Sequence, residues 1–335
     1  MYKSYKILFI IFTLISTIIS ISANSWLIAW IGLEINLLSI MPLMKNNMNK
    51  YSSETMIKYF IAQAMASMML LFFILISLNN IYFNLVNKNI INYMFSIPLL
   101  MKMGAAPFHF WFPEMMSGLE WNMALLILTW QKISPFILLF YLNIPMKMLL
   151  IPILASALTG SIMGFNSLCL RKMISYSSIN HISWMLVALM NYKIWLLYFL
   201  IYSLMNFFII MNLKLYNIFF TSQMSFLNNN KLMNLLFSMN LLSLGGLPPF
   251  IGFFPKLIVV NLLMQNNMMF LLLLMIMSTL INLFFYMRLI LPFTLLNKMQ
   301  LFLLNKNKNM NMFLLANFLT LSSTLTYSTL YSFMN

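Results

Sequence analysis

Residues 101–114 read MKMGAAPFHFWFPE, and residues 243–256 read SLGGLPPFIGFFPK. With Pro107 placed over Pro249, both stretches fit the pattern G-x-x-P-F-x-x-x-F-P. Proline removes a backbone hydrogen-bond donor and glycine lowers helix propensity, so each stretch is expected to interrupt a helix. The residues expected to make the breaks are Gly104, Pro107 and Pro113 in the first stretch, and Gly246, Pro248, Pro249 and Pro255 in the second.

The composition around these two stretches is that of a membrane protein. Hydrophobic residues make up 62% of the 335 residues, charged residues only 7%, and the mean hydropathy is +0.90. Soluble domains contain about 45–50% apolar and about 25% charged residues. We therefore expect an all-α polytopic membrane protein that forms a single membrane domain over residues 1–335. Apolar runs predict about eleven spans, near 7–22, 25–44, 57–79, 90–111, 121–141, 148–166, 173–190, 194–216, 232–259, 268–291 and 311–330.

The two breaks fall in the fourth and ninth expected spans. Backbone groups freed inside a bilayer are tolerated only where protein or a wet cavity satisfies them. A matched pair of broken helices in two halves of a chain points to a transport site, and an odd separation makes the two helices antiparallel. The pattern thus predicts an inverted-topology repeat. The alternative is that glycine and proline are merely frequent in membrane helices and that the two strings coincide.

Positive charge indicates the orientation of the chain. The nineteen Lys and Arg residues exceed the four acidic residues, which gives a net charge of +15. Most basic residues lie between spans, where they set orientation, so nucleic-acid binding is not expected. The joins on the N-terminal side hold Lys3, Lys6, Lys45, Lys50, Lys58, Arg171, Lys172, Lys231, Lys298, Lys306 and Lys308, whereas the opposite side holds Lys88, Lys147 and Lys193. This asymmetry places the N-terminus on the matrix or cytoplasmic side and the C-terminus across the membrane.

Five ionisable residues are expected at membrane depth: Glu34, Lys102, Lys132, His181 and Lys256. Such residues are costly in hydrocarbon and usually serve ion handling. Burial disfavours the charged forms of lysine and glutamate, whereas a nearby opposite charge favours them. A Glu–Lys pair can therefore hold or release a proton according to its separation. A water-linked chain of these groups would be a proton relay.

Each candidate also has a purely structural reading. Lys102 and Lys256 could snorkel to the interface, and His181 could be a helix-packing histidine. His109, among aromatic residues, is expected to pack at the first break, and Arg288 to pair with an acid or to snorkel. Surface or orientation roles are expected for Glu54, Glu114, Glu120, Arg171 and Lys172.

Redox and nucleotide chemistry are not visible in the chain. The single cysteine, Cys169, excludes a disulfide within the chain and any Cys-ligated iron–sulfur cluster. Two histidines are too few for a two-haem cytochrome with four axial imidazoles. No glycine-rich nucleotide-binding loop follows a strand pattern. We therefore expect no cofactor in this chain.

Five stretches together resemble one family. They are WIGLEINLLSIMPL around Glu34, LLMKMGAAPFHFWFPE around Lys102, LTWQKISP around Lys132, LRKMISYSSINHISW around His181, and LSLGGLPPFIGFFPK around Lys256. In their residues and in their order along the chain, these stretches resemble the mitochondrial NADH dehydrogenase subunit 2 family, the antiporter-like membrane subunits of respiratory complex I. The resemblance implies inverted five-helix repeats, here about 1–145 and 146–292, with an extra helix at 311–330.

The resemblance also implies roles. Glu34 matches the family's helix glutamate and Lys102 its partner lysine, while Lys132, His181 and Lys256 match the hydrated axis and the second broken helix. It implies a proton-translocating subunit of NADH:ubiquinone oxidoreductase in the mitochondrial inner membrane. NADH, FMN, iron–sulfur clusters and ubiquinone would be handled by other subunits. The expected partners are those subunits, including neighbouring antiporter-like ones, and inner-membrane lipids.

Two other functions remain open. The chain could be an independent cation/proton antiporter that needs no redox partner. It could also be a structural membrane subunit whose internal charges only hold helices together. Ion exchange by the isolated chain would favour the first alternative. Normal turnover with weakened assembly after neutral substitutions would favour the second.

Overall fold

The computed structural model describes residues 4–45, 51–78, 88–224 and 231–295. These ranges contain no strand, apart from an isolated bridge between Cys169 and Phe220. The expected helix at 311–330 lies outside the described residues. The helices are α1 Ser4–Ile21, α2 Trp26–Met44, α3 Tyr51–Leu78, α4 Lys88–Met103, α5 Trp111–Gly118, α6 Trp121–Leu128, α7 Trp130–Tyr141, α8 Met146–Phe165, α9 Leu170–Ala188, α10 Tyr192–Tyr216, α11 Lys231–Gly245, α12 Phe253–Gln265 and α13 Met269–Leu295.

The helices form because long apolar runs meet polar residues that cap them. The Ser25 hydroxyl accepts a hydrogen bond from the Ile28 N–H at the start of α2, and the Asn191 side chain accepts one from the Lys193 N–H at the start of α10. Asn217 ends α10 in the left-handed region, with φ +52°. Many large apolar side chains remain exposed on these helices, as expected for surfaces that face lipid.

The expected spans up to 268–291 all fall on helices, but three of them are interrupted. The spans at 90–111 and 232–259 break at the two shared motifs. The span at 121–141 divides into α6 and α7 at Thr129, which the sequence did not lead us to expect. By length and composition, six helical stretches in the described ranges can cross a membrane when α6 and α7 are taken together: Trp26–Met44, Tyr51–Leu78, Trp121–Tyr141, Met146–Phe165, Tyr192–Tyr216 and Met269–Leu291. A total of eleven spans therefore stays a prediction.

The chain divides into two compact units, Met1–Ser156 and Ala157–Asn335. The boundary lies within α8, a short distance beyond the boundary expected between the repeats. The division into repeats at 1–145 and 146–292 stays a prediction.

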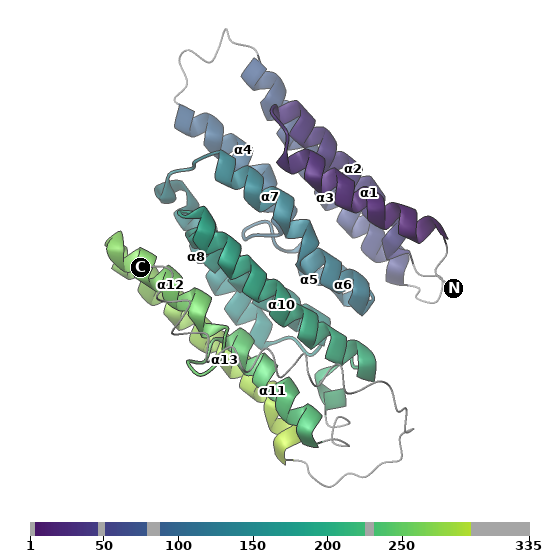
Figure 1. The fold of residues 1–335 in the computed structure, drawn as a ribbon, viewed down its shortest axis with the longest axis vertical. Coiled ribbons are helices and arrows are strands. Elements are labelled where there is room, and N and C mark those ends of the chain that lie inside the picture. Colours follow the sequence, from purple (N-terminus) through teal and green to yellow (C-terminus); the bar gives the residue numbers. More distant parts are fainter. Residues whose placement is uncertain (1–3, 46–50, 79–87, 225–230, 296–335) are drawn as a thin grey trace. The chain divides into compact units, whose positions relative to one another are not determined.

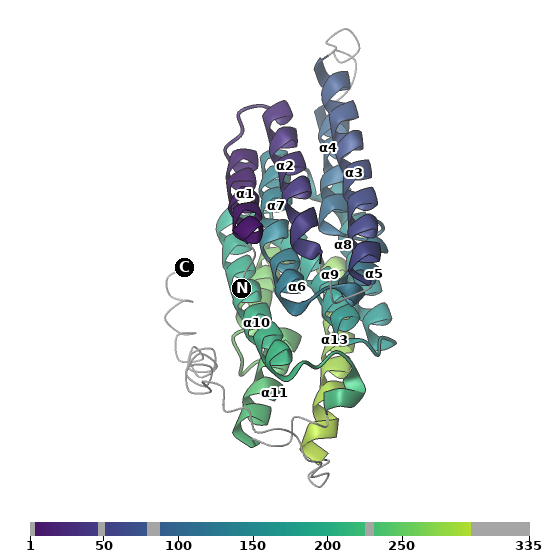
Figure 2. The same ribbon diagram turned by 90° about the vertical axis from the view of Figure 1, so that its right-hand side faces the viewer.

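In the first unit, α3 packs against α2, α4 and α5, and α7 packs against α1 and α4 (Figures 1 and 2). The α1–α2 hairpin is closely packed because Gly32 has no side chain. A Cβ atom there would lie 2.8 Å from the backbone nitrogen of Ser20. The second half of the broken helix, α5, lies beside the long continuous helix α3.

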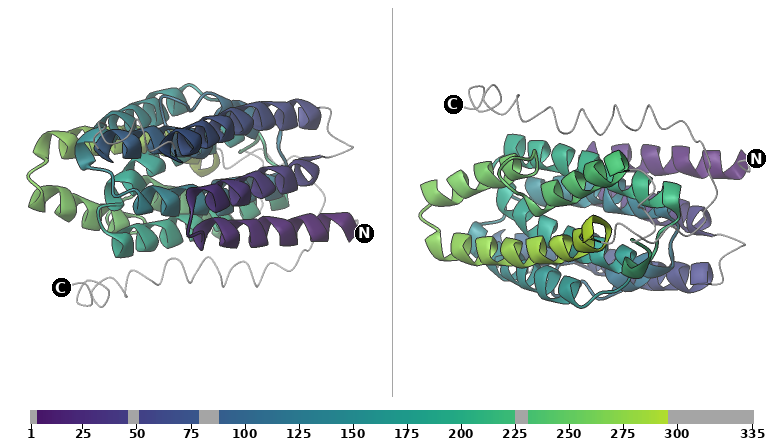
Figure 3. Two further views of the ribbon diagram at one scale, coloured as in Figure 1. Left: turned by 90° about the horizontal axis from the view of Figure 1, so that it is seen from above. Right: turned by 90° about the horizontal axis from the view of Figure 1, so that it is seen from below.

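In the second unit, α10 packs against α9, α11 and α12, and α13 packs against α9, α11 and α12. The short turn between α12 and α13 makes these two helices a hairpin (Figure 3). Gly160 lets α8 approach α9, because a Cβ atom there would lie 2.7 Å from the backbone nitrogen of Asn180. Small residues at a helix contact are the usual means of close packing in membranes.

Candidate functional site

The two predicted breaks are present, and they begin and end at aligned positions. The helices α4 and α11 end at Met103 and Gly245, and α5 and α12 begin at Trp111 and Phe253. Each pair is equivalent when Pro107 is placed over Pro249. Both motifs therefore lie between two helical segments.

The prolines differ in what they do at these breaks. Pro107, Pro248 and Pro249 lie between the helical segments, as expected. Pro113 and Pro255 do not interrupt a helix but lie in the first turns of α5 and α12. A missing N–H is harmless in a first turn, because the donor would have no partner within the helix. These two prolines therefore help to set where the second segments begin.

In the first break, α4 ends in a Schellman motif. Gly104 has φ +74°, its N–H donates to the Met101 carbonyl at 3.1 Å, and the Ala105 N–H donates to the Leu100 carbonyl at 3.1 Å. Glycine is required here both by the positive φ and by space, since a Cβ atom would lie 3.1 Å from the Phe112 side chain. The motif gives partners to two carbonyls that the helix end leaves unsatisfied.

The second break repeats this motif. Gly246 has φ +81°, its N–H donates to the Ser243 carbonyl at 3.0 Å, and the Leu247 N–H donates to the Leu242 carbonyl at 3.4 Å. A Cβ atom on Gly246 would lie 2.7 Å from Lys256 Nζ. This glycine therefore also makes room for a candidate relay lysine.

In each break, the backbone carbonyls that come next in the chain after the Schellman acceptors accept hydrogen bonds from buried side chains. In the first unit, Gln63 Nε2 donates to the carbonyl of Lys102 at 3.1 Å. In the second unit, Lys256 Nζ donates to the carbonyls of Gly245 at 2.8 Å and Leu244 at 3.4 Å. Lys102 and Leu244 occupy the same aligned position. The ammonium of Lys256 thus lies at the C-terminal end of α11, where the helix carbonyls point.

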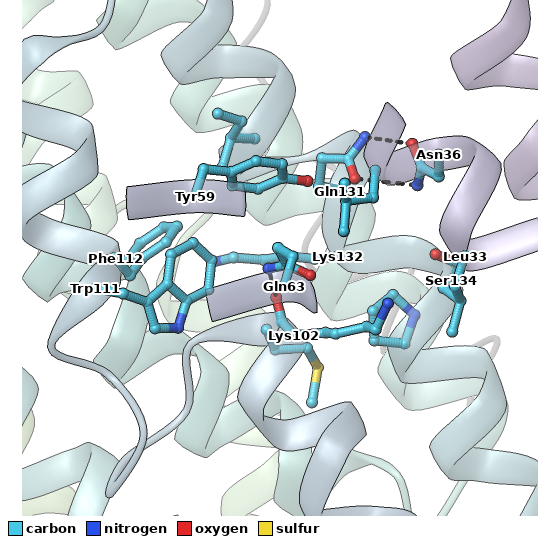
Figure 4. A pocket seen from close by; sticks show the side chains of 14 residues that line it. Leu33, Asn36, Tyr59, Gln63, Lys102, Trp111, Phe112, Gln131, Lys132 and Ser134 are labelled. Atoms are coloured by element: carbon cyan, nitrogen blue, oxygen red, sulfur yellow. Dashed lines mark hydrogen bonds between the residues drawn. The ribbon is translucent and has the colours of Figure 1, made fainter. Parts of the chain in front are cut away.

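A cavity of about 20 Å³ in the first unit brings two candidate lysines together (Figure 4). Lys102 and Lys132 both line it, with 7% and 2% of their surfaces exposed. A water molecule needs about 10–15 Å³ of such space and several polar partners. The cavity therefore has room for a water molecule, and two residues that can carry a proton line it. Its other lining residues are Leu33, Asn36, Leu37, Tyr59, Gln63, Met103, Trp111, Phe112, Ile127, Gln131, Ser134 and Pro135.

Side-chain amides make this cavity polar. Asn36 and Gln131 exchange two hydrogen bonds of 3.0 Å, which join α2 to α7 (Figure 4). Lys132 follows the interruption at Thr129, whose hydroxyl donates to the Leu125 carbonyl at 2.8 Å. Its ammonium lies 5.5 Å from the centre of the Phe112 ring. Lys132 is thus close to a break in its own helix, like Lys102.

Glu34 stands slightly apart from this arrangement. It lies half-buried on α2, one turn from residues that line the cavity, but does not itself line it. Its carboxylate acts on Lys102 electrostatically. No ion pair between the two is present in the part of the chain that the structure describes, where the ion pairs are those of Lys58. The expected Glu34–Lys102 pairing therefore stays a prediction.

His181 lies in the second unit, deep within α9. Its Nδ1 atom is 3.0 Å from the Tyr198 hydroxyl, and its ring also contacts that of Tyr202. All three side chains are buried. A histidine bonded to a phenol hydroxyl suits helix packing and proton exchange equally well.

Several other polar residues have partners outside the cavity lining. Lys58 pairs with Glu54 at 2.8 Å and with Glu114 at 3.0 Å, which links α3 to α5. Arg288 donates to the Ser167 carbonyl at 3.4 Å and lies over the Phe165 ring, rather than pairing with an acid. The imidazole of His109 packs against Phe110, as expected.

No group of three His, Cys, Asp or Glu residues suited to a metal ion occurs within the described ranges. The expectation of no cofactor in this chain stays a prediction. Within the first unit, the structure brings Lys102 and Lys132 together. Within the second, His181 on α9 is bonded to Tyr198, and Lys256 on α12 is bonded to the end of α11.

Sequence reasoning missed the uncharged members of these sites. The side chains of Gln63, Asn36 and Gln131 carry no charge, so the high cost of an ionisable group at membrane depth does not single them out. Amides in the middle of apolar spans, such as Gln63 in FIAQAMASMM, were the available signal. Tyr198 could not be assigned to His181, because many aromatic residues surround it in the sequence.

Comparisons with known proteins agree with this architecture. Residues 23–282 match the family model described as NADH:quinone oxidoreductase/Mrp antiporter, TM. The chain is 43% identical to NADH-ubiquinone oxidoreductase chain 2 of Anopheles gambiae over 98% of both chains. It is 42% identical to the protein of that name from Locusta migratoria, over 86% of this chain and 84% of the relative.

Solved structures show the same fold at lower identity. A chain of respiratory complex I from Thermus thermophilus, solved with bound aureothin, has a TM-score of 0.84 and 21% identity, over 97% of this chain and 78% of that one. A chain of the Mrp complex from Dietzia has a TM-score of 0.76 and 11% identity, over 96% of this chain and 75% of that one. The resemblance seen in the sequence is confirmed: the chain belongs to the NADH-ubiquinone oxidoreductase chain 2 family, within the wider NADH:quinone oxidoreductase/Mrp antiporter membrane family.

Proposed function

We propose that this chain is a proton-translocating membrane subunit of NADH:ubiquinone oxidoreductase. The single observation that carries the proposal is the cavity of about 20 Å³ that Lys102 and Lys132 share at interrupted helices. Burying an ammonium in a membrane helix costs about 2.5–3.5 kcal/mol on insertion scales. Two such groups facing a space that admits water are best accounted for by proton transfer.

In the proposed relay, electron transfer in other subunits changes the charge or hydration near Glu34. The changed field alters the proton affinity of Lys102, which exchanges a proton with Lys132 through water in the cavity. His181 and Lys256 continue the path in the second unit. The carbonyls of Leu244 and Gly245 hold the protonated Lys256 until it releases its proton.

The proposed architecture is a pair of inverted five-helix repeats followed by an extra C-terminal helix. The equivalent breaks in α4–α5 and α11–α12 support it, as does the way α3 and α10 each pack against both segments of one broken helix. Other complex I subunits and inner-membrane lipids would surround the chain in the mitochondrial inner membrane. NADH, FMN, iron–sulfur clusters and ubiquinone would belong to those other subunits, and the chain would also support assembly.

The proposed orientation places the N-terminus in the matrix and the C-terminus in the intermembrane space. It rests on the excess of Lys and Arg in alternate joins. A tag placed after Asn335 is therefore expected to be cut by protease added to the intermembrane-space side. Cleavage from the matrix side alone would contradict this orientation.

Replacement of Glu34 by Gln tests the proposed function. The variant keeps the size of the side chain but removes the charge that acts on Lys102. We expect NADH-driven proton uptake per assembled complex to fall about tenfold in inner-membrane vesicles. The half-exposed Glu114 on α5 offers a control, because Glu114→Gln removes an acid outside the cavity and should leave the rate near wild type.

The same measurement separates the rival functions. A structural subunit would tolerate Glu34→Gln with a normal rate per assembled complex and reduced assembly. An independent antiporter would exchange cations for protons after reconstitution of the isolated chain, without NADH. Either result would contradict the proposal.

A further inference from the structure

Gln63 is a buried polar residue to which the relay assigns no role. It lies within α3, with 6% of its surface exposed, and it lines the cavity together with Lys102 and Lys132 (Figure 4). Its Nε2 atom donates a 3.1 Å hydrogen bond to the backbone carbonyl of Lys102. The amide therefore contacts the main chain of a relay residue and not its ammonium.

This hydrogen bond satisfies a backbone carbonyl in the last turn of α4, where the helix provides no donor of its own. The Schellman motif satisfies the carbonyls of Leu100 and Met101, and Gln63 reaches the next one. The chain then leaves the helix through Gly104. Because α3 runs without interruption from Tyr51 to Leu78, Gln63 ties the end of a broken helix to a continuous one.

The second unit meets the same need with a different side chain. At the position aligned with Lys102, the Leu244 carbonyl accepts a hydrogen bond from Lys256. In that unit the donor is itself a candidate relay lysine. In the first unit the relay lysine supplies the carbonyl, and a neutral amide supplies the donor. The carbonyls of Lys102 and Leu244 occupy aligned positions, and each accepts a hydrogen bond from a different kind of donor. This indicates that the end of the first helical segment needs a side-chain hydrogen bond to stabilise it.

We propose that Gln63 is a positioning residue for Lys102. By fixing the last turn of α4, it holds the Lys102 side chain toward the cavity that Lys132 also lines. Proton transfer is steep in distance, so a displacement well below about 1 Å is enough to slow it a few-fold. The inference rests on the proposed role of Lys102 in proton transfer.

The test uses Gln63→Met in the assembled complex in inner-membrane vesicles. Methionine fills a similar volume and has no donor for the Lys102 carbonyl. The rate of NADH-driven proton uptake is measured per assembled complex, with the amount of complex taken from native gels. We expect the rate to fall about threefold. Gln63→Asn, whose amide is one methylene too short, should lower it similarly and carries the test if Gln63→Met does not assemble.

Ser67→Ala is the matched control. Ser67 lies one turn further along α3, and its hydroxyl donates to the Ala64 carbonyl within the same helix. Its removal deletes a partly buried hydrogen bond that lies within α3. The rate per assembled complex should remain at the wild-type level.

The double variant Gln63→Met with Lys102→Met distinguishes a positioning role from a merely structural one. The rate of the double variant is compared with the rate of Lys102→Met alone. If Gln63 acts through Lys102, the double variant is no slower than Lys102→Met alone. A wild-type rate in Gln63→Met, or a further threefold loss in the double variant, would overturn the inference. A wild-type rate in Lys102→Met would instead overturn the proposed function, so the two failures are distinguishable.

Discussion

Lys102→Met is expected to lower NADH-driven proton uptake per assembled complex by at least about tenfold. Methionine preserves the apolar length of the side chain but can neither hold nor donate a proton. The Lys102 carbonyl and its bond to Gln63 are main-chain features, so the end of α4 keeps its support. Assembly should therefore remain near wild type while transport is lost. The measurement is proton uptake and NADH oxidation in the same vesicles, because a coupled pump loses both together.

Lys193→Met is the control for this substitution. Lys193 is an exposed lysine in the first turn of α10. Its replacement by methionine removes the same charge from the chain without altering a cavity. It should leave proton uptake unchanged. If Lys102→Met matched this control, Lys102 would be a structural lysine, and the relay would have to begin elsewhere.

Lys256→Met is expected to damage both assembly and transport. The lysine donates to the buried carbonyls of Gly245 and Leu244, and an unsatisfied buried polar group costs about 1–3 kcal/mol. Loss of the donor should therefore reduce the amount of assembled complex. The complex that remains should pump at least about tenfold more slowly, because a titratable group of the relay is missing.

Lys256→Arg separates these two effects. Arginine still donates to the carbonyls at the end of α11, but it does not release a proton at physiological pH. Gly246, which has no side chain, faces the position of the ammonium. We expect near-normal assembly on native gels with proton uptake as low as in Lys256→Met. Normal uptake in Lys256→Arg would show that Lys256 only caps α11.

The helix breaks could be predicted from the sequence because glycine and proline act locally. Gly104 and Gly246 end their helices through a local preference, since glycine adopts their positive φ with the least strain. The interruption at Thr129 gave no such signal. The only local hints are the threonine itself and Pro135, which lies inside α7 and is tolerated there.

The polar contacts of the sites depend on packing and could not be predicted. Gln63 and Lys102 are distant in the sequence, and only the packing of α3 on α4 brings their atoms together. In the alignment of the two motifs, Glu114 lies opposite Lys256, and the sequence does not give the reason for this difference. The structure supplies it: Glu114 is directed to Lys58 on α3, whereas Lys256 is directed to the carbonyls of its own broken helix.

The central claim is that protons pass between Lys102 and Lys132 through water held at the broken helix. A density map of the assembled complex that resolves ordered water tests this claim most directly. We predict at least one water molecule in the cavity between the two lysine side chains, bonded to them or to the amides of Gln63 and Gln131. A dry cavity, with the two ammonium groups directed to lipid or headgroups, would contradict it.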